Sequence, residues 1–187
     1  MAKVTDPADL FDYKLSVALQ TEKAIERMLP RLAKEANNEE LRRGFERHLE
    51  ETRGHVDNLE EAIESVGSRP RSVKPLVAEG LELQHKAFGS DADEMVLPEV
   101  LDLVAIGSAA ATEHHEIATY EMLIALARSV GANDVIPLLE QNLEQERNML
   151  EQTKRIGERI GASASGDMER ALRPDAAQQQ EQGVRQP

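Results

Sequence analysis

The sequence predicts an all-α protein, an antiparallel four-helix bundle with a short helix in the crossover connection between its two hairpins. Apolar residues recur with a helical period along nearly the whole chain. Aromatic residues make up only 3% of the 187 residues, which disfavours strands. Short turns separate the first two and the last two long helical segments, whereas a connection of about 30 residues joins the pairs.

The first hairpin comprises helices over residues 7–36 and 39–66. Asp6 followed by Pro7 is a start signal, because an N-cap residue precedes a proline at the first helical position. Pro30 lies inside the first helix, where we expect a kink or a local adjustment, since proline cannot donate a backbone hydrogen bond. A short turn between the two ranges makes the helices antiparallel neighbours.

The connection and the second hairpin follow the same logic. A short crossover helix is expected over residues 76–88, between segments rich in loop-forming residues. The third long helix covers residues 98–130, with Val96 as an alternative start. We expect Asn133 to cap the fourth helix, which ends near Gly161.

The remaining residues divide the chain into two parts. Residues 163–187 are polar and contain few large apolar side chains, so we expect a disordered tail. Residues 1–162 then form one domain, which is long enough to bury a core without disulfides.

Composition narrows the classes of function. The formal net charge of −13 repels nucleic acid and anionic membranes, so we expect neither as a partner. The absence of cysteine excludes disulfides, cysteine-ligated zinc and thiol nucleophiles. No segment approaches the ~18 apolar residues of a membrane span, and the N-terminus lacks the apolar run of a secretory signal. We therefore expect a cytoplasmic protein.

Carboxylates interrupt two of the apolar stripes. Glu22 takes an inward position midway along the first helix, and Glu146 does so in the last. An ionised carboxylate in a helical core is costly unless it is paired, protonated or bound to a metal. The two stripes are Phe11, Leu15, Ala18, Glu22, Ile25, Leu29 and Leu32, and Val135, Leu139, Asn142, Glu146, Met149, Thr153, Ile156 and Ile160.

The second and third helices add donors at the same level of the bundle. His48, Glu51 and His55 are three and four residues apart and share one face of the second helix. Glu113 and Glu116 share a face of the third helix. Helical bundles build dimetal centres from such side chains, and oxygen and imidazole donors suit iron or manganese. We predict a site for one or two of these ions.

Simpler roles exist for the same residues. Glu22 could pair with a lysine or arginine across a helix interface, and His48 and His55 could be ordinary, partly buried histidines. Tyr120 fits a packed aromatic residue with a hydrogen-bonded hydroxyl group. Phosphate-binding loops, dinucleotide fingerprints and nucleophile elbows are absent from the sequence.

At these residues the sequence resembles the YciF/YciE-type ferritin-like stress proteins, a bacterial family. The stretches that carry the resemblance are TEKAIERMLPRLA, HLEETRGHVDNLE, EHHEIATYEMLIALARSVGA and PLLEQNLEQE. They lie within about residues 8–160. The resemblance implies a ferritin-like fold, a dimetal carboxylate site, a homodimer and a role in stress responses.

The resemblance also implies a set of ligands. In ferritin-like di-iron proteins the first and third core helices each offer a Glu, and the second and fourth each offer a Glu-x-x-His. By position, Glu22 corresponds to the first helix and Glu51 to the second. Glu113, together with Glu116, corresponds to the third helix, and Glu146 corresponds to the fourth.

This sequence departs from that pattern at both histidines. Gly54 stands three residues after Glu51, and Met149 stands three residues after Glu146. His48 and His55 are the candidates to substitute on the second helix, with Asn142 as the candidate on the last. A single-metal site is therefore an alternative to a di-iron or di-manganese site.

These predictions favour a metal-binding protein of the bacterial stress response with ferroxidase-like or catalase-like reactivity toward dioxygen or peroxide. The alternative is a non-catalytic, dimeric helical scaffold with a vestigial metal site, and the missing Glu-x-x-His motifs favour it.

Overall fold

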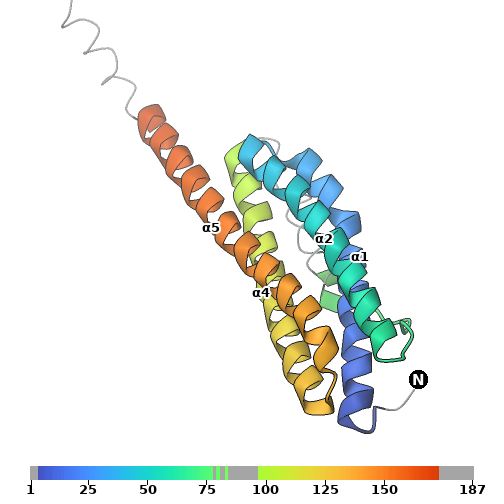
Figure 1. Cartoon of the computed structure of the whole chain (residues 1–187). Helices are drawn as coiled ribbons and strands as arrows, with labels where there is room; N and C mark the ends of the chain where they lie inside the picture. The colour runs from blue at the N-terminus through green and yellow to red at the C-terminus, as the bar shows by residue number, and fades with distance from the viewer. Residues whose placement is uncertain (1–3, 78, 81–82, 84–96, 173–187) are drawn as a thin grey trace, which may run out of the picture.

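The computed structural model describes residues 4–77, 79–80, 83 and 97–172, and over these residues it is all-α (Figure 1). Two long hairpins account for almost all of it. The four long helices are α1 (Pro7–Glu35), α2 (Glu39–Ser65), α4 (Pro98–Val130) and α5 (Ile136–Leu172). A 3-10 turn, η1 (Asn133–Val135), precedes α5.

The ends of the first three long helices follow the expected local chemistry. The Asp6 side chain accepts a hydrogen bond from the backbone N–H of Asp9 at the start of α1, and Asn38 caps α2 in the same way. Gly131 ends α4 with φ of 77°, a left-handed conformation that favours glycine. α1 continues through Pro30 as one helix, so the expected disturbance does not interrupt it.

Two predictions about α5 were wrong. Asn133 does not cap this helix, because it begins the intervening turn η1, and that turn has no side-chain cap. The helix also continues past Gly161 to Leu172, so residues 163–172 are helical rather than disordered. A single glycine lowers helix propensity by only about 1 kcal/mol, which does not end a helix of this length. The rest of the predicted tail lies outside the described residues.

The two hairpins pack side by side to form the bundle. α1 runs along α2 and α4 runs along α5, while α2 also contacts α5 and α1 also contacts α4. The Asp102 carboxylate near the start of α4 accepts backbone hydrogen bonds from Asn37 (2.9 Å) and Asn38 (2.8 Å) in the α1–α2 turn. The end of α2 lies at the opposite end of the bundle, so the connection to α4 must cross its full length.

The crossover is described only in part. Residues 76–77, 79–80 and 83 are helical, and the remainder of the short helix expected over residues 76–88 lies outside the described residues. Ahead of it, Arg71 and Ser68 both contact the Asp12 carboxylate on α1. These contacts hold the first part of the connection against α1.

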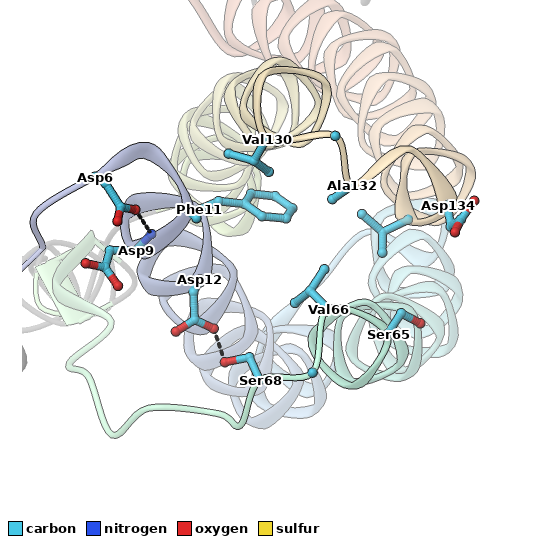
Figure 2. Close-up of a pocket in the computed structure, with 14 residues that line it drawn as sticks. Asp6, Asp9, Phe11, Asp12, Ser65, Val66, Ser68, Val130, Ala132 and Asp134 are labelled. Atoms are coloured by element: carbon cyan, nitrogen blue, oxygen red, sulfur yellow. Dashed lines mark hydrogen bonds between the residues drawn. The ribbon is translucent and has the colours of Figure 1, made fainter.

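Figure 2 shows the end of the bundle where α1 begins and α2 and α4 end. Phe11, Val66 and Val130 point toward the middle of this end, and an open pocket of about 590 Å³ lies there. Aspartates around the rim include Asp6, Asp12 and Asp134. This pocket is remote from the carboxylates that interrupt the core.

The core consists of two apolar clusters separated by a polar layer. The first cluster draws on residues before Glu22 and Glu146 and after His55 and Glu116; the second draws on the other side of each helix. Each of the four long helices therefore changes from apolar to polar and back at one level. The largest fully buried apolar members are Phe45, Leu15, Leu19, Ile25, Leu41, Leu59, Ile63, Leu123, Leu139 and Ile156.

In the described part of the chain, no helix has an apolar stretch long enough to cross a lipid bilayer.

Candidate metal centre

Six acidic and histidine side chains occupy the polar layer between the two apolar clusters. All four long helices contribute, and each of these side chains is at most 3% exposed. They are Glu22 from α1, His48 and His55 from α2, Glu113 and Glu116 from α4, and Glu146 from α5. Because the inward stripe of each helix reaches this level once, the helical period itself brings the six together.

The first group of donors surrounds the His48 ring. Its Nε2 atom lies 3.4 Å from Oε1 of Glu113 and 3.8 Å from Oε2 of Glu146. Glu116 completes the group, in which one donor atom from each residue lies within 4.8 Å of all the others. One imidazole and three carboxylates are a donor set that iron and manganese accept.

The second group surrounds the His55 ring. Its Nδ1 atom lies 2.9 Å from Oε1 of Glu146 and 3.5 Å from Oε2 of Glu22. Glu146 belongs to both groups and turns one oxygen to each histidine. A carboxylate in that position can bridge two cations.

Most of the inward oxygens have no hydrogen-bond donor among the described residues. Even the 2.9 Å approach of His55 to Glu146 is an ion pair without hydrogen-bond geometry. Buried polar atoms are almost always satisfied, so orphans gathered at one level indicate a missing partner. They are Oε2 of Glu22, Oε2 of Glu113 and both oxygens of Glu116 and Glu146. The donor set therefore fits one or two bound cations.

Without a cation, bound protons neutralise part of the negative charge of the layer. Burial raises the pKa of Glu113 and of Glu116 well above the ordinary value, and the neighbouring carboxylates raise it further. Burial would lower the pKa of His55, but the Glu22 and Glu146 carboxylates outweigh it and raise the pKa to about 10. A cation that entered would therefore displace protons.

Glu146 keeps its negative charge. Burial acts to raise its pKa, but contacts with His55 and Glu113 prevail and lower the pKa to about 2. A carboxylate that stays ionised between two histidines is the natural bridging group of this layer.

A chain of hydrogen bonds fixes Glu22 from the side of the first apolar cluster. The buried Tyr120 hydroxyl group donates to Oε1 of Glu22 and accepts from the Asn142 side chain at 3.0 Å. Asn58 in turn donates to Asn142 at 2.7 Å. Burial first, and the Glu22 charge next, raise the pKa of Tyr120 well above its usual value. Asn142 thus supports Tyr120 rather than joining either donor group.

Two residues contact the ring nitrogens of the histidines that point away from the buried carboxylates. Glu51, predicted as a donor, lies outside both groups; its side chain is 34% exposed, and its Oε2 lies 3.5 Å from Nδ1 of His48. Gln145 accepts from Nε2 of His55 at 2.9 Å. The prediction from sequence missed Gln145 and Asn58. The sequence does contain a signal for Gln145, because this residue occupies the same position in NLEQER as Glu51 does in HLEETR.

The chain resembles known proteins along most of its length. Protein YciF of Escherichia coli (strain K12) is 33% identical over 140 residues, which cover 74% of this chain and 82% of YciF. The crystal structure of the E. coli stress protein YciF matches with a TM-score of 0.79 at 29% identity, covering 84% of this chain and 98% of that one.

Two further structures show the same architecture. YcfI from Rhodopseudomonas palustris matches with a TM-score of 0.77 at 28% identity, covering 82% of this chain and 96% of that one. A ferritin-like, diiron-carboxylate protein from Bacillus anthracis str. Ames matches with a TM-score of 0.62 at 18% identity, covering 82% of this chain and 99% of that one. At that identity the likeness establishes the fold alone, which is ferritin-like, as predicted.

A family model described as a domain of unknown function (DUF892) matches residues 6–165, which is most of the chain. The expected resemblance to YciF-type proteins is confirmed by this match and by the E. coli relative. With its ferritin-like fold, the chain belongs to the DUF892 family.

Proposed function

We propose that this protein binds one or two ions of iron or manganese at the polar layer and acts in the bacterial stress response. The observation that carries the proposal is the set of orphaned carboxylate oxygens on three helices, facing two histidines in the buried interior. Such a concentration of acidic groups is costly without a cation. E. coli YciF, a relative, is described as a stress protein, which supports the physiological part.

The geometry suggests which residues would hold each ion. His48, Glu113 and Glu116 would hold one ion, Glu22 and His55 a second, and Glu146 would bridge them. Bound iron or manganese supplies redox chemistry toward dioxygen or peroxide, of the ferroxidase or catalase kind. Around it, the two apolar clusters exclude bulk water, and the Tyr120 hydroxyl group holds Glu22 in place.

Metal content tests the proposal. The wild type is purified from medium supplemented with iron or manganese and compared with the double variant Glu22→Ala plus Glu146→Ala by elemental analysis. We expect stoichiometric metal in the wild type and its loss in the variant. The matched control is Glu50→Ala plus Glu144→Ala, because both glutamates are exposed on α2 and α5. Equal trace metal in all three proteins would instead favour the non-catalytic scaffold.

Reactivity is tested on the loaded protein. Oxygen uptake after addition of Fe(II) measures a ferroxidase, and gas release from hydrogen peroxide measures a catalase. We expect one of the two rates to depend on Glu146. Rates equal to those of free metal would contradict a role in either reaction.

We also propose that the protein is a cytoplasmic homodimer that associates through the outer face of α4. This face carries small or apolar side chains at heptad spacing, which suits close helix packing. They are exposed or half-buried: Val100, Val104, Gly107, Ala111, Ala118 and Ala125, with His114 on the same face. Light scattering should report a dimer for the wild type and a monomer for Ala111→Glu, with Asn148→Glu on α5 as control. An unchanged mass for Ala111→Glu would remove α4 as the interface.

A further inference from the structure

The two histidines present opposite ring nitrogens to the carboxylates. His48 turns Nε2 inward, toward Glu113 and Glu146, and Nδ1 toward Glu51. His55 turns Nδ1 inward and Nε2 toward Gln145. Carboxylate and amide oxygens only accept hydrogen bonds, so each outer nitrogen must carry a hydrogen. The inner nitrogen of each ring is then the one that can donate its lone pair to a cation.

The partners behind the two rings differ in charge. A carboxylate such as Glu51 makes the imidazole in front of it a stronger donor, whereas the neutral amide of Gln145 does so less. The inner sides of the two rings also differ in the number of carboxylates that face them. Three glutamates face the His48 position and two face the His55 position, with Glu146 common to both.

We propose that Glu51 and Gln145 are positioning residues that make the two cation positions unequal, so that the His48 position fills first and the His55 position second. This inference rests on the proposed function, because it concerns the same layer. It assigns Glu51 an action through His48 instead of direct coordination. It also assigns a role to Gln145, which no prediction from sequence had given.

The places of these two residues in the fold support a matched pair of roles. Glu51 and Gln145 stand at the same position of the related stretches HLEETR and NLEQER, in the second helix of each hairpin. Both are partly open to solvent, so they can be changed without creating a cavity in the core. Among the described residues, neither side chain makes another hydrogen bond or ion pair.

Titration of the metal-free protein with Co(II), followed by visible absorption and by calorimetry, separates the two binding steps. We expect Glu51→Gln to weaken the first step by about 10–100-fold and to alter its absorption spectrum, with the second step unchanged. Gln145→Ala should weaken only the second step. Gln145→Glu should tighten the second step and bring the two affinities closer together.

The matched control for Glu51→Gln is Glu50→Gln, which makes the same change of charge at an exposed neighbour, and the matched control for Gln145→Ala is Gln141→Ala, the same substitution at an exposed position of α5. Thermal unfolding of each metal-free variant establishes that it folds. The positioning roles are overturned if Glu51→Gln and Gln145→Ala change both steps equally or leave both unchanged.

The outcomes also separate this inference from the proposed function. A wild type that takes up no Co(II) contradicts the metal site itself. A wild type that takes up two ions, with neither variant selective, leaves the site standing and removes the inequality. If only one ion binds, Glu51→Gln must weaken it and Gln145→Ala must not; the reverse result overturns the assignment.

Discussion

Glu116 shows how strongly a single side chain depends on its surroundings in this layer. Both of its oxygens are buried without a hydrogen-bond donor among the described residues, and the neighbouring Glu146 and Glu22 carboxylates act with burial to raise its pKa. Its charge can exist there only if a cation or a proton compensates it. The same residue therefore destabilises the fold without a cation and stabilises it with one.

This reversal is testable with Glu116→Gln. Because burial and neighbouring charges raise the folded-state pKa of Glu116, its contribution to stability is present below about pH 4.5 and is lost as pH rises. At pH 8 the metal-free variant should melt about 2–4 °C above the wild type, which corresponds to ~1 kcal/mol for a chain of this size.

The difference between the two proteins should disappear near pH 4.5. With Mn(II) at one hundred times its dissociation constant, the order should invert, since binding stabilises the wild type by ~2.7 kcal/mol. Scanning calorimetry with and without Mn(II) provides the measurement. A variant that melts below the wild type under both conditions would contradict the repulsion described here.

His55 gives the layer a second dependence on pH. Its pKa is raised from 6.5 to about 10, so the stability it contributes is complete below pH 6.5 and is lost by pH 10. The metal-free protein should therefore lose stability across this range, by at most about 1.4 kcal/mol per pH unit. His55→Gln should flatten the profile, and the exposed His114→Gln should not. A wild-type stability that stays constant from pH 6.5 to pH 10 would refute this assignment.

At the scale of the helices, the sequence predicts correctly which side chains are buried where helical periodicity alone determines it. The interrupted stripe of α5 is buried along its whole predicted length, from Val135 to Ile160. The cap at Asp6 lies where the residue types predict it. Residue types alone could not predict the extension of α5, because a glycine such as Gly161 ends some helices and is tolerated inside others.

The candidate site was harder to predict, because a shift of one residue in the helical register changes which side chain faces inward. Counting from Glu51 placed a glycine where the family pattern has histidine. The structure buries Thr52 fully, three residues before His55, while Glu51 stays at the edge. At the inward positions, Thr52-x-x-His55 on α2 carries only the histidine of the Glu-x-x-His pattern and Glu146-x-x-Met149 on α5 carries only the glutamate. His55 Nδ1 lies 2.9 Å from Oε1 of Glu146.

The Asp102 carboxylate is the clearest link between the hairpins. It accepts two backbone hydrogen bonds from the α1–α2 turn while it remains buried on α4. Asp102→Ala leaves two donors unpaired and should cost ~2–3 kcal/mol, lowering the melting temperature by about 5–10 °C.

Metal stoichiometry should remain that of the wild type in Asp102→Ala, because the polar layer is several helical turns away. The exposed Asp134→Ala is the control for the loss of one negative charge. A change below 1 °C in Asp102→Ala would show that the turn is held by other contacts.

At the scale of the whole molecule, the bundle and the end of α5 are separate regions. α5 extends past the other three helices, as Figure 1 shows, and Ala162, Ser163 and Ser165 are exposed. Removal of residues 163–187 should therefore change the melting temperature by less than about 2 °C and leave metal stoichiometry intact. Calorimetry and elemental analysis of the shortened protein measure both quantities. A fall of more than 5 °C would place this segment within the folding unit.

The apolar clusters above and below the polar layer also determine how anything reaches Glu146. An ion travelling along the bundle axis would have to shed its hydration shell against leucine and phenylalanine side chains at either end. A sideways route past the flank of α2, where the Glu51 side chain is partly exposed, would avoid both clusters. Binding and release of the ion would then require a transient displacement of α2. Residence time would be governed by that opening, whatever the equilibrium affinity.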